Sequence, residues 1–281
     1  MKTAGKTENE PMIADERMVA FINSFDKGNT PFLDEIEKYA RETEVPIIRK
    51  QMQSLLRFLL AFFKPGKILE VGTAIGFSAL LMSEYAPVDC RITTIEKYEK
   101  RSPIARENFK RAGKEGQIEL LEGDAVDILR NLDESYDLIF MDAAKGQYIN
   151  FLPDILRLLA PGGLLVSDNV LQDGEIIESR FAVTRRNRTI HARMREYLYE
   201  LTHHPQLETC ILPVGDGVTL STKVGAGEEE KLSDTGEGAR KEEKLSDTGE
   251  GAREEEELPG AKVNIKVVGK VTDKREVGQN D

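Results

Sequence analysis

The sequence predicts an α/β fold: a doubly wound, mostly parallel sheet of seven strands, with helices before it and an antiparallel hairpin at its C-terminal end. From residue 67 onward, short apolar runs that end in Gly or an acid alternate with longer amphipathic stretches, as in parallel strands joined by helices. Later, two strand-like runs flank a GDG turn, which favours antiparallel pairing. The chain has 281 residues, 40% of them hydrophobic, which is enough for one sizeable core.

Helices come first along the chain. Residues 1–14 are polar, and we expect them to form a flexible N-terminus. From Asp15 to about residue 62, apolar positions recur at helical spacing, with interruptions near Pro31 and Pro46. This segment therefore predicts helices ahead of the sheet.

Strands and helices then alternate. We expect strands in KILEVG (67–72), RITTIE (91–96), IELLEGD (118–124), YDLIFMD (136–142) and GGLLVSDN (162–169). Helical patterns lie between them, near 77–85, 101–112 and 149–159, with a shorter one after the third strand. A last helix, near 184–203, places on one face Ile190, Met194, Tyr197, Leu198 and Leu201. The two runs of LETCILPVGDGVTLSTKV follow as the hairpin.

Residues 15–224 hold all of these elements and are expected to form one domain. Beyond them, EEKLSDTGEGAR occurs at 229–240 and again at 242–253. The two copies have almost no apolar surface to offset their ordering entropy, so we expect residues 225–260 to form an acidic, disordered tail. Within residues 261–281, the run AKVNIKVVGKVT alternates like a strand and predicts a short β segment, to which no function is assigned.

Composition excludes several classes of protein. The two cysteines, Cys90 and Cys210, are isolated and have no metal-ligand spacing, so they are expected to be reduced thiols of a cytoplasmic protein. The N-terminus lacks the apolar region of a secretory signal, and the most apolar segment, residues 54–63, is too short to span a bilayer. We therefore expect a soluble protein without a membrane partner. No Ser or Cys has a paired base, and all three histidines lie in or beside the last helix, which argues against a hydrolytic triad.

A glycine loop follows the first expected strand. LEVGTAIGFS places Glu70 near the end of the strand, Gly72 and Gly76 in a tight turn, and Ser78 at the start of a helix. Such a turn brings backbone N–H groups close to a ligand, although a purely structural turn would look the same. The loop is not the dinucleotide-binding G-x-G-x-x-G, because Ala74 occupies the middle glycine position.

Acids close four successive strands: Glu96, Asp124, Asp142 and Asp168. Each acid alone could be a solvated strand end or a helix cap. Together they would share the carboxyl edge of a parallel sheet, which is where ligands bind in open α/β folds. The sequence therefore predicts a ligand site at this edge.

These motifs occur in the order E-x-G-x-x-x-G-x-S, ribose acid, G-D-A, D-x-x-K and D-N across roughly residues 40–224. In that order they resemble the class I S-adenosylmethionine (SAM)-dependent methyltransferases, which have a Rossmann-like fold. Within that class they resemble the metal-dependent group that contains catechol and caffeoyl-CoA O-methyltransferases. The resemblance implies a SAM-dependent O-methyltransferase whose cofactor contacts are Ile48, Glu70, Gly72, Thr73, Ser78, Glu96, Asp124, Ala125 and Asp142. Of these, Gly72, Thr73 and Ser78 would line the methionine part, Glu96 would hold the ribose, and Asp124 and Ala125 would meet the adenine.

Asp142, Asp168 and Asn169 end neighbouring strands and offer three oxygen ligands, which suits Mg2+ or another hard divalent cation. Bound beside an acceptor with two adjacent oxygens, such an ion would favour loss of the acceptor's hydroxyl proton. The resemblance implies that Lys145 receives that proton as the catalytic base. The plainer alternatives are that Asn169 caps the following helix, and that Asp142 and Lys145 are solvent-facing loop residues.

An Arg-rich segment, residues 179–195, bears on the acceptor. Its Arg185, Arg186, Arg188 and Arg193 would project from a helix and could hold an RNA backbone, although a solvated helix face explains them equally well. With VPII, GTAIGFSA and LPVGDGVTLS, the segment most resembles bacterial tRNA 5-hydroxyuridine methyltransferases. The resemblance implies methylation of the wobble 5-hydroxyuridine in the tRNA anticodon loop, to 5-methoxyuridine.

Two other functions stay open at this point. One is O-methylation of a small catechol-like phenol or a hydroxycinnamoyl-CoA ester, and the other is a catalytically silent SAM-binding protein. Members of the family are often homodimers, and helices within residues 15–62 could supply the interface.

Overall fold

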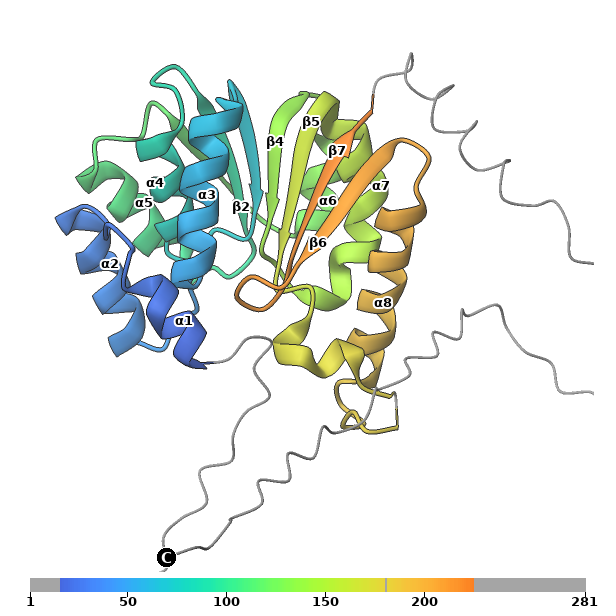
Figure 1. Ribbon diagram of the computed structural model, residues 1–281. Coiled ribbons are helices and arrows are strands. Elements are labelled where there is room, and N and C mark those ends of the chain that lie inside the picture. The colour runs from blue at the N-terminus through green and yellow to red at the C-terminus, as the bar shows by residue number, and fades with distance from the viewer. Residues whose placement is uncertain (1–15, 180, 225–281) are drawn as a thin grey trace, which may run out of the picture. The chain divides into compact units, whose positions relative to one another are not determined.

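The computed structural model describes residues 16–179 and 181–224, all within one compact unit of the chain. Figure 1 shows these residues as a central sheet with helices on both of its faces. The flexible N-terminus expected at residues 1–14, the acidic tail at 225–260 and the β segment at 261–281 lie outside the described residues.

The helices follow the expected order closely. They are α1 (Glu16–Asn23), α2 (Pro31–Glu42), α3 (Lys50–Phe63), α4 (Phe77–Tyr85), α5 (Ser102–Arg111), α6 (Ala125–Asn131), α7 (Tyr148–Leu158) and α8 (Arg188–His203). Two 3-10 helices, η1 (Lys145–Gln147) and η2 (Gln172–Ile177), lie beside the carboxyl ends of the central strands. None of the helices in the described part of the chain is long and apolar enough to cross a membrane.

The seven strands form one sheet in the order β3-β2-β1-β4-β5-β7-β6. They are β1 (Lys67–Val71), β2 (Arg91–Glu96), β3 (Ile118–Glu122), β4 (Tyr136–Met141), β5 (Leu159–Asp168), β6 (Leu207–Leu212) and β7 (Val218–Lys223). Strands β1 to β5 run parallel, and β7 pairs antiparallel with both β5 and β6. The predicted fold class, including the C-terminal hairpin, is therefore confirmed.

Residue alternation along the strands builds two hydrophobic cores, one on each face of the sheet. On β1, Ile68 packs with residues of α2, α3 and α4, whereas Leu69 packs with residues of α7 and α8. Phe140 and Met141 on β4 divide in the same way. Because both faces are covered, the carboxyl edge of the sheet is left as the place where strand-end side chains can meet a ligand.

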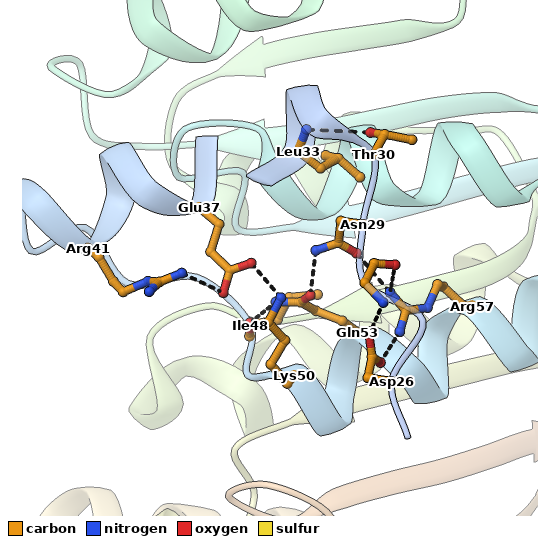
Figure 2. A network of polar contacts seen from close by, with 11 residues as sticks. Asp26, Asn29, Thr30, Leu33, Glu37, Arg41, Ile48, Lys50, Gln53 and Arg57 are labelled. Carbon is orange, nitrogen blue, oxygen red and sulfur yellow. Dashed lines mark hydrogen bonds and ion pairs between the residues drawn. The ribbon is translucent and has the colours of Figure 1, made fainter. Parts of the chain in front are cut away.

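A polar network joins the N-terminal helices and their loops to one another (Figure 2). Buried Gln53 on α3 donates to the carbonyl of Ile48 (3.0 Å) and accepts from the amide of Asn29 (2.9 Å). Arg57, one turn further along α3, donates to Asn29 (2.7 Å) and forms an ion pair with Asp26. The network thus ties the loop between α2 and α3, which contains Ile48, through Gln53 to the loop that precedes α2.

The last helix begins later than the sequence pattern indicated. We expected it from about residue 184, but α8 starts at Arg188, and residues 185–187 form a turn. The apolar side chain of Val183 is buried, and the amide of Asn187 reaches the carboxylate of Glu175 (3.1 Å), so tertiary contacts hold this segment out of the helix. The expected apolar face is confirmed, with Met194, Tyr197 and Leu201 buried.

Candidate active site

A cavity of about 640 Å³ opens at the carboxyl ends of the central parallel strands. Among the residues that line it are Ile48, Gly72, Thr73, Ser78, Glu96, Asp124, Ala125, Asp142, Lys145 and Asn169. The structure therefore gathers most of the predicted site residues, from segments far apart in the sequence, around one space. Glu70 and Asp168 do not line this cavity.

The glycine loop forms one wall of the cavity through its main chain. Gly72 has φ +110°, and a Cβ at that position would lie 2.1 Å from the carbonyl oxygen of Asp142. Gly76 has φ +85°, and a Cβ there would lie 2.5 Å from the ring of Phe109. Both positions therefore need glycine, because an L side chain would be strained and would collide.

Two acids that follow the next two strands, Glu96 and Asp124, also line the cavity. The Glu96 carboxylate accepts from the backbone N–H groups of Ala74 and Tyr98, both at 2.7 Å, so its direction is fixed. Its oxygens keep lone pairs for two neighbouring hydroxyl groups. Asp124 is the N-cap of α6 and also pairs with Lys97 at 2.6 Å. The hydrogen bond from Lys97 lowers the Asp124 pKa below its usual range, so this acid stays ionised.

Glu70 lies behind the glycine loop and does not contact the cavity. Strand alternation turns it to the face covered by α4, where its carboxylate bonds Thr94 and Ser78. It is fully buried, and its Oε1 has no hydrogen-bond partner. Burial raises the Glu70 pKa to about 7. The position thus fits support of the loop from below, rather than the direct cofactor contact that we expected.

A second group of side chains meets at the ends of β4 and β5. Lys145 Nζ lies 3.0 Å from Asp142 Oδ1, and Asn169 Nδ2 lies 3.3 Å from the same oxygen. Asp168 is buried beside them and accepts from the backbone N–H of Asn169 (2.7 Å). Burial, and then the nearby Asp142 carboxylate, raise the Asp168 pKa to about 7.

The donor chemistry of this group fits a hard divalent cation. Asp142 and Asp168 would supply two carboxylates, and Asn169 would supply one amide oxygen. Within residues 16–179 and 181–224, no three His, Cys, Asp or Glu side chains gather as a metal cluster. Two neighbouring carboxylates, one buried (Asp168) and one half-buried (Asp142), repel each other and would gain from a nearby dication. The remaining coordination positions would go to water or to acceptor oxygens, as is usual for Mg2+.

A smaller cavity of about 280 Å³ adjoins the same residues from the other side. Asp168 lines it, and Asn169 and Ile48 line both cavities. Its outer wall contains an ion pair of Arg49 with Asp216, at 2.7 Å, which joins the α2–α3 loop to the turn of the hairpin. The sequence pattern predicted only a turn at GDG and gave no signal for this ion pair, because Arg49 and Asp216 lie almost at opposite ends of the domain's sequence.

The four arginines that were predicted to bind RNA differ in position and in contacts. Arg185 and Arg186 are exposed but precede α8 instead of projecting from it. Arg188 donates to the carbonyl of Val183 (3.3 Å), and Arg193 donates to that of Gly146 (3.0 Å). The expected outward-facing row of four arginines is therefore wrong as geometry, since half-buried Arg188 and Arg193 bind the protein's own backbone.

Comparisons with known proteins agree with this geometry. Residues 24–224 match the family model described as O-methyltransferase. A catechol O-methyltransferase of Niastella koreensis is 31% identical over 168 residues, which cover 58% of this chain and 70% of that protein. Caffeoyl-CoA O-methyltransferase 2 of Populus trichocarpa is 32% identical over 183 residues, which cover 60% and 71%.

A solved structure is similar over a longer stretch. The SAH-bound methyltransferase of Podospora anserina superposes with a TM-score of 0.69 at 27% identity, covering 80% of this chain and 100% of that one. Together with the family match over residues 24–224, the fold and the strand-end acids lead to one conclusion. The chain belongs to the O-methyltransferase family.

Proposed function

We propose that the protein transfers the methyl group of SAM to one of two adjacent oxygens on a planar acceptor, with a hard divalent cation held by Asp142, Asp168 and Asn169. The observation that carries the proposal is the position of Lys145, 3.0 Å from Asp142 and on the wall of the large cavity. An amine there can reach both a bound methyl donor and a hydroxyl near the acids.

The large cavity suits the cofactor. SAH in the Podospora anserina structure supports an S-adenosyl ligand for this chain as well. The glycine loop would lie along the methionine part, Glu96 would bind the ribose hydroxyls, and Asp124 with Ala125 would meet the adenine. Ile48, held by Gln53, would cover the cofactor from the α2–α3 loop.

The chemistry needs one proton transfer and one displacement. Lys145, in its neutral form, accepts the proton of the acceptor hydroxyl. The resulting oxyanion attacks the methyl carbon in line with the sulfonium, the new O–CH3 bond forms, and the S–CH3 bond breaks to leave SAH. A hard divalent cation, when bound, would orient the two acceptor oxygens and favour the oxyanion.

For the acceptor, we propose the wobble 5-hydroxyuridine of tRNA, whose 5-hydroxyl and 4-oxygen form the required pair. Exposed Arg185 and Arg186 support this choice, because they come just before the start of α8, which packs on the Lys145 loop through Ile190 and Gly146. Two exposed arginines at this end of α8 could hold the phosphates of a splayed loop.

A small catechol-like phenol or a hydroxycinnamoyl-CoA ester is the second candidate acceptor. The names of the catechol and caffeoyl-CoA relatives favour it, and both compounds present two adjacent ring oxygens. A silent SAM-binding protein is the least supported reading, since it would have no use for a lysine paired with an acid beside two further metal-type ligands.

The test is methyl transfer from labelled SAM, with and without EDTA, to tRNA that contains 5-hydroxyuridine and in parallel to catechol and caffeoyl-CoA. Labelling of the tRNA alone, abolished by EDTA, would support the tRNA proposal. Labelling of the small phenols alone would move the acceptor to the second candidate. The control is Lys145→Met, which should bind SAM normally but lose turnover by at least 100-fold, and transfer by this variant at the wild-type rate would contradict the role of Lys145.

A further inference from the structure

We propose that Tyr148 is a positioning residue for Lys145: its buried hydroxyl holds the lysine amine in place and joins the ends of the two strands that carry the acidic ligands. The inference rests on the proposed function of Lys145 as the base. Tyr148 occurs three residues after Lys145, at the first position of α7, and no part of its side chain is exposed.

The Tyr148 hydroxyl lies within hydrogen-bonding reach of four groups. The carbonyl oxygens of Met141, at the end of β4, and Asp168, at the end of β5, are both 3.1 Å away. The backbone N–H of Ala143 and the Nζ of Lys145 are both 3.3 Å away. One atom therefore contacts both strand ends, the loop after Asp142 and the candidate base.

These contacts match what a phenol can do. A hydroxyl donates one hydrogen and accepts through two lone pairs. Tyr148 can donate to one of the two carbonyls while it accepts from Ala143 and from Lys145. Burial raises the Tyr148 pKa well above its usual range, which keeps the hydroxyl neutral.

The ring is held so that the hydroxyl cannot swing away. Tyr148 packs edge-to-face on buried Tyr197, with 5.4 Å between the ring centroids. The Lys145 amine lies 5.3 Å from the centroid of the Tyr148 ring, which adds a cation–π attraction to the hydrogen bond. Packing on one side and charge on the other therefore fix the ring and its oxygen.

The contacts of Tyr148 fix the orientation of the Lys145 amine. An amine that has lost a proton keeps two N–H groups and one lone pair. Asp142, at 3.0 Å, and Tyr148, at 3.3 Å, can take the two N–H groups, while the third contact, with the Asp168 carbonyl, is the longest at 3.5 Å. Without the Tyr148 hydroxyl, the amine would be free to rotate about its stem, and its lone pair would meet the acceptor proton less often.

The experiment compares Tyr148→Phe with Tyr136→Phe, a matched loss of a hydroxyl from a buried tyrosine at the opposite end of β4. For Tyr148→Phe we expect kcat to fall at least tenfold while the KM for SAM and the SAM Kd stay within twofold. Tyr136→Phe should leave kcat within twofold. In the Lys145→Met background, Tyr148→Phe should change the residual rate no further, because it acts through Lys145.

Amide exchange gives a readout that does not depend on activity. In Tyr148→Phe the Ala143 amide loses its acceptor, so its hydrogen exchange should quicken at least tenfold, whereas Tyr136→Phe should not change it. If the wild type methylated no acceptor, the proposed function would fail, but this exchange arm would still decide whether the contact exists. Unchanged exchange, or a kcat within twofold of wild type, would overturn the inference.

A second variant covers the case in which Tyr148→Phe does not fold. p-Aminophenylalanine at position 148 keeps the ring and places a nitrogen at the position of the hydroxyl. Its two N–H groups can donate to the Met141 and Asp168 carbonyls, and its one lone pair can accept from Lys145. We expect it to recover at least a third of the wild-type kcat. A folded variant with this residue that is as slow as Lys145→Met would overturn the inference.

Discussion

The two halves of the active site are built in different ways. The half at the ends of β1 to β3 is mostly main chain: a glycine loop, with Glu96 fixed by two nearby backbone N–H groups. The half at the ends of β4 and β5 depends on side chains from distant segments, such as Arg193 on Gly146 and Arg49 on Asp216. The difference teaches that backbone groups shape most of the cofactor half, whereas the acceptor half depends on side-chain contacts that form only when distant segments have folded together.

The largest expected effect is that of Gly72→Ala in the cofactor half. The new Cβ would lie 2.1 Å from the Asp142 carbonyl oxygen at a positive φ, so the loop must move. We expect loss of stability of about 2–4 kcal/mol and SAM affinity reduced by about 100-fold, or about 2.7 kcal/mol. Calorimetric titration and urea unfolding measure both. Gly28→Ala is the control, because its φ is also positive but nothing lies within 4 Å of its Cβ. Equal effects of the two variants would contradict the close contact.

Glu70→Gln tests whether the Glu70 carboxyl, buried behind the glycine loop, gains and loses its proton near neutral pH. The folded pKa of about 7 is above the ordinary value of 4.5, so the stability due to Glu70 is present below pH 4.5 and is lost as the pH rises through 7. The amide cannot ionise, so at pH 8 the variant should be more stable than wild type, by at most about 3 kcal/mol. Urea unfolding of wild type and variant at pH 5 and pH 8 measures this. Asp168 titrates in both proteins, so the change with pH in the stability difference between them reports on Glu70 alone. An equal difference at both pH values would show that Glu70 does not titrate in this range.

Arg193→Ala tests the acceptor half by removing a contact that is 47 residues away along the chain. The Lys145 loop should loosen, so we expect kcat to fall about fivefold to tenfold, or about 1–1.4 kcal/mol, with SAM affinity unchanged. The matched variant, Arg185→Ala with Arg186→Ala, should instead weaken RNA binding, flatten its salt dependence and leave methylation of a small phenol unchanged. If Arg193→Ala alone lowered the affinity for RNA, the prediction that Arg193 binds RNA would stand.

The smallest expected effect on the site comes from the N-terminal helices, which belong to neither half. We propose that the protein is a homodimer, because Phe58 and Phe62 on α3 are 64% and 76% exposed and stack on each other, while α1 buries none of its residues. Phe58→Glu with Phe62→Glu should yield a monomer in sedimentation, with SAM affinity within about twofold. A wild-type protein that sediments as a monomer would contradict the proposal.

Local patterns were enough for the fold and for the cofactor half. The bounds of α4 match the expected 77–85, and the four strand-end acids lie on one edge of the sheet. Both could be predicted because the spacing of apolar residues and the glycines between elements are signals that span only a few residues. Glu70 was expected to contact the cofactor but is buried behind the glycine loop, because strand alternation decides which face of the sheet a side chain meets. Tyr148 and the Arg49–Asp216 pair were missed, and the contact of Arg193 with Gly146 was not foreseen, since long-range packing sets these contacts. Of these, only the D-x-x-K-x-x-Y spacing of Tyr148 offered a signal that could have been read.

The contact between Gly72 and Asp142 has a consequence for the order of events. The Asp142 N–H donates to the Val71 carbonyl at 3.0 Å, and its own carbonyl lies against Gly72, so the two halves share one stretch of backbone. A ligand that tightens the glycine loop must also bias the position of Asp142. By thermodynamic reciprocity, an acceptor held near Asp142 then changes the affinity for the methyl donor by the same factor. We therefore expect this backbone contact to couple the binding of the methyl donor to the binding of the acceptor. SAH, which lacks the methyl group, need not shift Asp142 to the same extent as SAM.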